Sequence, residues 1–277
     1  LAAQYGLAEK LVLGKVKAAL GLDRVRFAAV GAAPISTEVL EFMASLDIVI
    51  WEIYGQSEDT GPTTVSSPGR AKFGAVGAPF PETEVKIAED GEILVKGRNV
   101  FLGYFRQPEA TAETLKDGWL YSGDLGAFGD DGLLRITGRK KDIIITAGGK
   151  NITPSEIENK LKSYAYISDV VVIGDKRKYL TCLVMIDQEN VEKYAQDQRI
   201  PFSNFASLCA NEQVQALIAS IIAEVNQDFA RVEQVKDFRL IDIILTAEDD
   251  ELTATMKLKR GFVEKRYKPL IEQMYKN

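Results

Sequence analysis

The sequence contains no histidine in 277 residues and only two cysteines. Without histidine, Ser-His-Asp catalysis, Cys-His catalysis and metal sites built on imidazole are all excluded. Cys182 and Cys209 lie in apolar surroundings and neither belongs to a CxxC pair, so we predict buried free thiols in a reducing compartment. Any metal must therefore bind through oxygen ligands, which favours magnesium together with phosphates.

Long apolar runs are also absent, since none approaches the roughly 20 residues that a membrane span needs. Charged Glu9, Lys10, Lys15 and Lys17 occur at helical spacing near the start, which argues against a signal peptide. A net charge of −6 does not favour a general nucleic-acid binder. Because the hydrophobic and charged fractions, 46% and 27%, are ordinary for globular proteins, we expect a cytoplasmic protein of one or two domains.

The first 70 residues predict a βαβ unit. A helical pattern runs from Leu7 to Leu20, and a short apolar run from Val25 to Val30 follows it. A helix is expected over 37–46 and a buried strand over 48–54. Strand, helix and strand in this order imply a parallel pair, with ligand-binding loops at the carboxyl ends of its strands.

Residues 71–139 predict short antiparallel strands that form a small barrel-like subdomain. The hairpin signals are Glu89–Glu92 and Asp130–Gly132, each between runs of alternating polarity. A domain boundary is expected at Gly138–Asp142.

An α+β pattern follows Lys141. Thr153–Glu156 reads as a capping box with proline at the first helical position, opening a helix to about Ser163. The remaining expected elements are strands over 170–174, 180–187 and 238–245, helices over 188–198 and 212–229, and a terminal helix from about Leu258.

The motif Tyr54-Gly55-Gln56-Ser57-Glu58 ends the second predicted strand. Its aromatic ring could stack a base, its glycine could let the backbone approach a ligand, its hydroxyl could contact a phosphate and its carboxylate could hold Mg²⁺. The alternative is a solvated polar turn at a strand end.

Between Tyr121 and Glu158, Asp124 occupies a glycine turn, Arg139-Lys140-Lys141 is a basic cluster and Gly148-Gly149 is a flexible pair. A carboxylate can accept both hydroxyls of a ribose, and an arginine can fork onto a phosphate. These features together suggest a nucleotide site near the domain boundary. The alternatives are a carboxylate that satisfies its own turn and an exposed charge run.

Lys257 precedes the terminal helix within Leu252–Arg260. A lysine on a loop can stabilise a developing phosphate charge, although a solvent-facing residue explains it equally well. The basic residues of Lys257–Lys268, interleaved with Phe262 and Tyr267, suggest a solvated helix face more than a membrane or nucleic-acid patch.

In their order, these motifs resemble those of the adenylate-forming (AMP-binding) enzymes, which include acyl-CoA synthetases, luciferases and adenylation domains. The resemblance runs from about Phe27 to Arg260. Gly148–Glu158 and Leu252–Arg260 look most like bacterial long-chain fatty acid–CoA ligases. The resemblance implies that a fatty acid reacts with ATP to give an acyl-adenylate, which coenzyme A converts to a thioester, with Mg²⁺ as cofactor.

By the same resemblance, Glu58 would hold Mg²⁺ and act in catalysis. Ser57, where the family usually has threonine, would contact phosphate. Asp124 would bind the ribose hydroxyls with the support of Arg139. The full set implied for nucleotide binding is Gly31, Ala32, Ala33, Tyr54, Gly55, Ser57, Asp124 and Arg139.

The resemblance also assigns residues to a change of domain position between two half-reactions. Lys141 matches the hinge, and Gly148 and Gly149 would border the channel for the pantetheine arm of CoA. Lys257 matches the lysine that stabilises charge during adenylation, and Met256 replaces the glycine usual before it.

One departure concerns the family's phosphate loop, which ends in lysine and lies upstream of the segment that this chain matches. We therefore expect the C-terminal half of such an enzyme, inactive alone and partnered by the missing N-terminal half. It would comprise residues 1–70 as the end of a large α/β domain, 71–139 as the β-rich subdomain, 140–141 as the hinge and 142–277 as a mobile α+β domain.

Two other functions stay open. The chain could load amino or aryl acids on a carrier protein, or it could bind nucleotide without catalysis. A long acyl chain makes a peripheral encounter with the inner membrane face plausible, whereas no nucleic-acid partner is expected.

Overall fold

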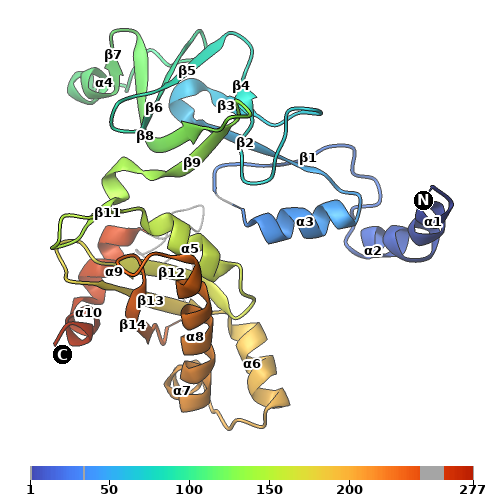
Figure 1. Cartoon of the computed structure of the whole chain (residues 1–277), viewed down its shortest axis with the longest axis vertical. Coiled ribbons are helices and arrows are strands. Elements are labelled where there is room, and N and C mark those ends of the chain that lie inside the picture. The colour runs from blue at the N-terminus through green and yellow to red at the C-terminus, as the bar shows by residue number, and fades with distance from the viewer. Residues whose placement is uncertain (1, 34, 244–258, 277) are drawn as a thin grey trace. The chain divides into compact units, whose positions relative to one another are not determined.

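The computed structural model describes residues 2–33, 35–243 and 259–276 (Figure 1). The chain divides into two compact units, Leu1–Lys140 (unit 1) and Lys141–Asn277 (unit 2). Mixed helices and several sheets make up both units, as the predicted α/β and α+β fold class requires.

Unit 1 begins with a helical stretch and the predicted βαβ motif. The parallel register pairs Ala28 with Ile50 and Val30 with Glu52, which confirms the βαβ prediction. Ser36 caps the intervening helix by accepting a hydrogen bond from the Val39 amide. The elements are α1 (Ala2–Ala8), a π-helical segment η1 (Glu9–Leu13), α2 (Gly14–Ala19), β1 (Ala28–Val30), α3 (Thr37–Ser45) and β2 (Ile50–Gln56).

Two antiparallel strands extend the first sheet of unit 1 to the order β1-β2-β3-β4. A short 3₁₀ turn, η2 (Ser57–Asp59), joins β2 to β3 (Gly61–Val65), and β4 (Ala78–Pro79) forms the far edge. Gly77 (φ 84°) lies so close to Val65 that an added Cβ would meet backbone atoms at 2.1 Å. A side chain at Gly77 would therefore separate the two strands.

The second sheet of unit 1 has the order β5-β6-β8-β7, with β9 paired to β8. All its ladders are antiparallel, and hairpins turn at both predicted signals. Within the described residues the sheet is open, so the barrel-like shape is not a closed barrel. The elements are β5 (Thr83–Ile87), β6 (Glu92–Gly97), α4 (Pro108–Thr114), β7 (Leu115–Lys116), β8 (Trp119–Phe128) and β9 (Leu134–Arg139).

The core of unit 1 joins its two sheets. Tyr54 of β2 packs in one apolar cluster with Ile93, Val95, Leu120 and Leu134 of the second sheet. Residues 1–70 and 71–139 therefore share a core within unit 1.

Unit 2 contains a three-stranded sheet, β12-β13-β14, and six α-helices within the described residues. The first pair of strands is antiparallel and the second pair is parallel. The elements are η3 (Lys140–Asp142), β10 (Ile144–Ile145), β11 (Asn151–Ile152), α5 (Pro154–Lys162), β12 (Ile167–Ile173), β13 (Leu180–Ile186), α6 (Gln188–Asp197), α7 (Phe205–Ala210), α8 (Glu212–Val225), η4 (Asn226–Asp228), β14 (Val235–Leu240), α9 (Arg260–Arg266) and α10 (Lys268–Met274).

Helices cover both faces of this sheet. Alternate residues of β13, such as Cys182 and Val184, pack with α5 and α8 in one cluster. Leu183 and Met185 point to the opposite cluster, which contains Val263 of α9 and residues of α10. A strand buried on both faces needs a continuous apolar sequence, which explains the run from Leu180 to Ile186.

Several predictions for unit 2 need correction. Proline does begin α5, but Thr153 accepts no capping hydrogen bond through its side chain, so the predicted capping box is wrong. The short helix α7 was not predicted, although Asn204 and Ser207 form a reciprocal cap at its start. β14 lies at 235–240, so it overlaps the expected strand over 238–240 but begins three residues earlier. Most of Leu252–Arg260 lies outside the described residues.

Both cysteines are buried free thiols, as predicted. Burial raises the pKa of the Cys182 thiol and raises that of Cys209 to about 12, so neither forms a thiolate near neutral pH.

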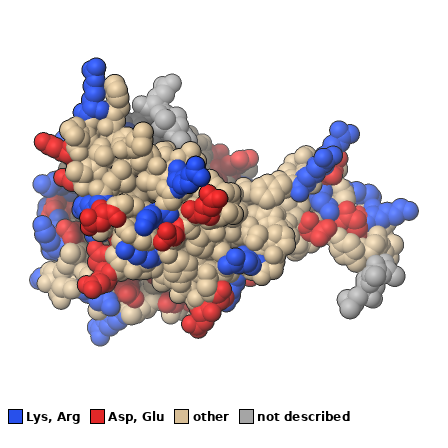
Figure 2. All heavy atoms as spheres, turned by 90° about the horizontal axis from the view of Figure 1, so that it is seen from above, with Lys and Arg blue, Asp and Glu red and all other residues tan. Residues whose placement is uncertain are grey.

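On the face drawn in Figure 2, acidic and basic side chains are interspersed, with uncharged areas between them. None of the helices that the structure describes combines the length and the apolar character needed to cross a membrane.

A partly buried ion pair ties α9 to α5 and β12. Arg260 Nη2 lies 2.5 Å from Glu158 Oε1, and its Nη1 donates to the Val172 carbonyl at 2.6 Å. The same Glu158 oxygen accepts the Val172 amide at 2.8 Å. Removing one partner of such a pair leaves the other charge without compensation.

We predict that Glu158→Ala lowers the free energy of unfolding of unit 2 by about 3 kcal/mol, because Arg260 then remains partly buried without its carboxylate. Far-UV circular dichroism during urea titration measures this loss. Trp51 and Trp119 are the only tryptophans and both lie in unit 1, so their fluorescence should not change. The exposed Glu224→Ala of α8 is the matched control, and an equal loss there would contradict the prediction.

Candidate nucleotide site

The Asp124 turn is a bulge in β8. The ladder pairs Glu92 with Leu125 and Leu94 with Tyr121, so the residues between the two pairs protrude from β8. Gly123 adopts φ +73°, a left-handed conformation that glycine adopts without strain and that lets the strand bulge there. Asp124 is thereby presented at a fixed point of the strand.

Two side chains hold the Asp124 carboxylate, which is 9% exposed. The Tyr54 hydroxyl donates to Oδ2 at 2.9 Å, and Arg139 Nε donates to Oδ1 at 3.1 Å. Burial, followed by the nearby Asp124 charge, raises the pKa of Tyr54, which keeps its hydroxyl protonated as a donor. Each oxygen of a carboxylate can accept more than one hydrogen bond, so contacts with Tyr54 and Arg139 are compatible with contacts to sugar hydroxyls.

The structure shows two contacts of Tyr54 that the sequence did not predict. Its hydroxyl contacts Asp124, and its ring packs in the core of unit 1. Because Tyr54 and Asp124 are 70 positions apart in the sequence, no local pattern indicated this hydrogen bond. The expected role of Tyr54 in nucleotide binding stays a prediction.

The end of β2 is fixed by close packing against β3. A Cβ on Gly55 would meet the Gly61 carbonyl oxygen at 1.6 Å, so no larger residue fits there. Asp59 is buried and accepts the Gln56 amide at 3.0 Å and the Thr63 hydroxyl. Burial raises the pKa of Asp59. Together these contacts hold the turn that carries Ser57, whose side chain is exposed, and Glu58.

Glu58 has a partner that sequence reasoning missed. The Tyr104 hydroxyl donates to Glu58 Oε1 at 2.7 Å, and the Phe101 amide donates to the Glu58 carbonyl at 2.8 Å. Burial, followed by the hydrogen bond to Glu58, raises the pKa of Tyr104. Tyr104 belongs to an irregular segment with no periodic pattern, so no local signal marked it.

The loop Gly31–Ala33 follows β1, and the Tyr54–Glu58 motif ends the adjacent parallel strand β2. Their carboxyl ends lie at the same edge of the sheet, as predicted. A Cβ on Gly31 would meet the Ile53 carbonyl oxygen at 2.9 Å, and Ala32 adopts φ 64°. The loop is therefore tightly constrained beside β2.

The remaining predicted residues belong to unit 2. Lys141 lies in the 3₁₀ turn at its first residues, and Gly148-Gly149 turn the chain between β10 and β11. Gly149 has φ +77°, a conformation that favours glycine. Lys257 lies outside the described residues. The contacts seen in the structure join Tyr54, Asp124 and Arg139, and separately Glu58 and Tyr104.

Across the ranges that the structure describes, no group of three or more acidic, cysteine or histidine side chains could enclose a metal ion. Glu58 offers a single carboxylate, and Tyr104 occupies one side of it. A single carboxylate suits Mg²⁺ that is held mainly by substrate phosphates and water. Glu58 therefore fits such an ion without forming a protein cage.

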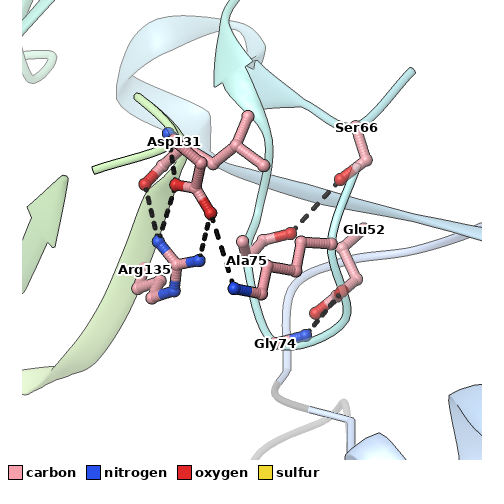
Figure 3. Close-up of polar contacts among 8 residues, drawn as sticks. Glu52, Ser66, Gly74, Ala75, Asp131 and Arg135 are labelled. Carbon is pink, nitrogen blue, oxygen red and sulfur yellow. Dashed lines mark hydrogen bonds and ion pairs between the residues drawn. The ribbon is translucent and has the colours of Figure 1, made fainter. Parts of the chain in front are cut away.

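Glu52 of β2 is another buried carboxylate, beside the loop before β4 (Figure 3). The Gly74 amide donates to its Oε2 at 3.1 Å, and Ser66 of the same loop donates to the Ala75 carbonyl. Burial raises the pKa of Glu52 from 4.5 to about 7, and the Gly74 hydrogen bond opposes this only in part. Asp131 and Arg135 pair nearby in the same view.

Comparison with known families defines the class of protein. The family model described as AMP-binding enzyme matches residues 5–105, and the model described as AMP-binding enzyme C-terminal domain matches residues 141–277. The chain belongs to the AMP-binding, or adenylate-forming, enzyme family. Its resemblance to that family is thereby confirmed.

Two individual relatives show which members of the family this chain resembles. A Mycobacterium tuberculosis protein, fadD11, whose name assigns it as a fatty-acid–CoA ligase, is 42% identical over 99% of this chain and 48% of its own length. The long-chain-fatty-acid–CoA ligase FadD15 of Mycobacterium bovis is 38% identical over 99% of this chain and 46% of its own length. The chain thus spans about half the length of these relatives.

Among solved structures, the adenylation domain of a carboxylate reductase from Mycobacterium chelonae has the same fold. Its TM-score is 0.76 at 24% identity, over 99% of this chain and 42% of that chain.

We predict that Tyr54→Phe destabilises unit 1 by about 2 kcal/mol, because a buried hydrogen bond to a carboxylate is lost while the ring still packs. Urea unfolding followed by tryptophan fluorescence measures the change. Tyr121→Phe on β8, where the tyrosine is half-buried, serves as the control and should change stability by less than about 0.5 kcal/mol. Equal effects of the two changes would contradict the assigned bond.

Glu52→Gln tests the buried Glu52 carboxylate through the pH dependence of the free energy of unfolding. Since the pKa of Glu52 is raised from 4.5 to about 7 on folding, the native state binds more protons in that window. The free energy of unfolding therefore falls as pH rises through it. Glutamine can still accept the Gly74 amide but does not ionise, so the stability of Glu52→Gln relative to the parent should grow between about pH 5 and pH 8. If the free energies of unfolding of Glu52→Gln and of the parent changed in parallel between about pH 5 and pH 8, the raised pKa of Glu52 would be contradicted.

Proposed function

We propose that this chain is part of an ATP-dependent fatty acid–CoA ligase that prefers long acyl chains. The enzyme would join a fatty acid to AMP with release of pyrophosphate, and CoA would then displace AMP to form the thioester. Fatty acid, ATP and CoA are the proposed substrates, since family membership and the names of fadD11 and FadD15 support this reaction.

The observation that carries the proposal within this chain is the Asp124 carboxylate, held by Tyr54 and Arg139. Asp124 would accept the ribose hydroxyls of ATP, with Arg139 setting its orientation. A pre-oriented carboxylate binds a diol more tightly than a mobile one, because less side-chain entropy is lost on binding. This arrangement suits a nucleoside ligand.

The other roles follow from the family motifs. Ser57 would contact phosphate, and Glu58, oriented by Tyr104, would hold Mg²⁺ and so act in catalysis. The Gly31–Ala33 loop and Gly55 would border the nucleotide, and Lys257 would stabilise charge during adenylation. A metal ion and fixed positive charge suit this step, since adenylation requires little proton transfer.

The domain organisation is part of the same proposal. Residues 1–70 and 71–139 would belong to the large domain, with 142–277 as the mobile domain and 140–141 as the hinge. The division between units after Lys140 supports a pivot at Lys141. Gly148 and Gly149 would line the path of CoA in the second half-reaction.

We also propose that the active enzyme contains further polypeptide that covers residues 5–50. Helices η1 and α2 have no buried residue, and α3 buries only Leu40. Phe27 and Phe42 are 64% and 58% exposed. So much exposed apolar surface is typical of a face that packs against another part of a protein. The missing part would supply the phosphate loop and most of the acyl tunnel.

We predict that this polypeptide alone catalyses no ATP–pyrophosphate exchange above background. The protein extended to the length of its relatives should show exchange that requires Mg²⁺ and a fatty acid, with thioester formation on addition of CoA. Asp124→Ala should lower kcat/KM for ATP roughly 100-fold in that protein, because its hydrogen bonds to ribose are lost. Glu224→Ala is the matched control and should leave exchange unchanged.

Robust exchange by the isolated chain would contradict the need for further polypeptide. Exchange with amino or aryl acids but not with fatty acids would favour a carrier-loading module, and nucleotide binding without exchange in the extended protein would favour a non-catalytic role.

A further inference from the structure

Glu92 is a buried carboxylate that the proposed reaction does not use. It begins β6, is 4% exposed and lies beside the bulge that carries Asp124. Its Oε1 accepts the Gly123 amide at 2.9 Å, and its Oε2 accepts Lys140 Nζ at 2.8 Å. One side chain thus contacts both the Asp124 turn and the last residue of unit 1.

These contacts close a ring. Asp124 accepts Arg139 Nε, Arg139 precedes Lys140 in the chain, Lys140 pairs with Glu92, and Glu92 accepts the amide of Gly123 beside Asp124. Three of its five links are non-covalent contacts, and the other two are peptide bonds. In such a ring no member can move far unless at least one contact breaks.

Ser122 and Asp90 make further contacts around this ring. Ser122 Oγ donates to the Ile93 carbonyl at 2.7 Å and accepts the Asp124 amide at 3.1 Å, so it also supports the turn. Asp90 also pairs with Lys140, at 2.6 Å, but its side chain is half exposed, and its Oδ1 accepts the Glu92 amide instead of a group of the Asp124 turn. Of Asp90 and Glu92, it is Glu92 whose side chain contacts both Lys140 and the Gly123 amide.

We propose that Glu92 is a positioning residue that couples the orientation of the Asp124 turn to Lys140, and so to the unit boundary at Lys140–Lys141. The proposal rests on the proposed function in one respect: Asp124 is taken to bind the ribose. If binding of a nucleoside at Asp124 stabilises the turn, it also stabilises the Glu92–Lys140 pair, and the reverse holds by linkage. A change of conformation at the boundary would then alter nucleotide affinity.

The test is a double-mutant cycle of Glu92→Gln and Lys140→Met on this chain, read by hydrogen–deuterium exchange of the peptide that spans β8. Each single variant should speed exchange of the Gly123 and Asp124 amides, by about tenfold for Glu92→Gln. Lys140→Met should have no further effect when Glu92 is already replaced. Asp90→Asn, which removes the other partner of Lys140, is the control and should leave β8 exchange unchanged.

Equal effects of Lys140→Met in both backgrounds, or no effect in the parent chain, would overturn the coupling. Tryptophan fluorescence and circular dichroism would show that each variant is folded. Because exchange is measured without nucleotide, this outcome does not depend on the proposed function.

A second measurement uses AMP binding by calorimetry. Glu92→Gln should weaken binding about fivefold to tenfold, whereas Asp124→Ala should abolish it. If Asp124→Ala leaves AMP affinity intact, the ribose role of Asp124 fails while the exchange cycle still decides the role of Glu92. If AMP binds and Glu92→Gln does not weaken it, the positioning role is overturned.

Discussion

A carboxylate withdrawn from water must be compensated by donors, and unit 1 meets this requirement for Asp124 with residues from distant parts of the chain. Tyr54 supplies a hydroxyl from the first sheet and Arg139 a guanidinium from the neighbouring strand. The two sheets share one apolar core around Tyr54. Neither partner can therefore be displaced without disturbing that core or the β8–β9 ladder, which is why a bulge can carry a precisely oriented acidic group.

Unit 2 meets a different constraint, since its central strand is covered on both faces. The apolar run of β13 satisfies that constraint directly. The edge contacts are polar and specific, as in the pairing of Arg260 with Glu158. Thr181 on the same strand donates to the Tyr275 hydroxyl, so even the buried polar group of β13 has a partner near the C-terminal helix.

Patterns of short range could be read from the sequence, and contacts of long range could not. Periodicity and turn signals located the βαβ unit, both hairpins and the β12–β13 pair, because these depend on neighbouring residues. The Thr153 cap failed because a capping motif permits a hydrogen bond without requiring it. Tyr104 and Glu92 were missed as partners of Glu58 and Gly123, since their pairings depend on tertiary packing across 46 and 31 residues. The assigned roles of Lys141, Gly148, Gly149 and Lys257 stay predictions.

Gly55 illustrates how a motif can be required for two reasons at once. Its Cα hydrogen faces the carbonyl of Gly61 across a gap that no side chain could enter. Related sequences would retain glycine here whether or not a nucleotide ever approached it. A glycine shared among relatives at position 55 therefore gives no evidence that this residue contacts a ligand. A loss of activity on substitution of Gly55 would indicate misfolding of the β2–β3 pair. Ser57, whose side chain is exposed, and Glu58, whose carboxylate accepts the Tyr104 hydroxyl, are the positions where comparison among relatives carries information about chemistry.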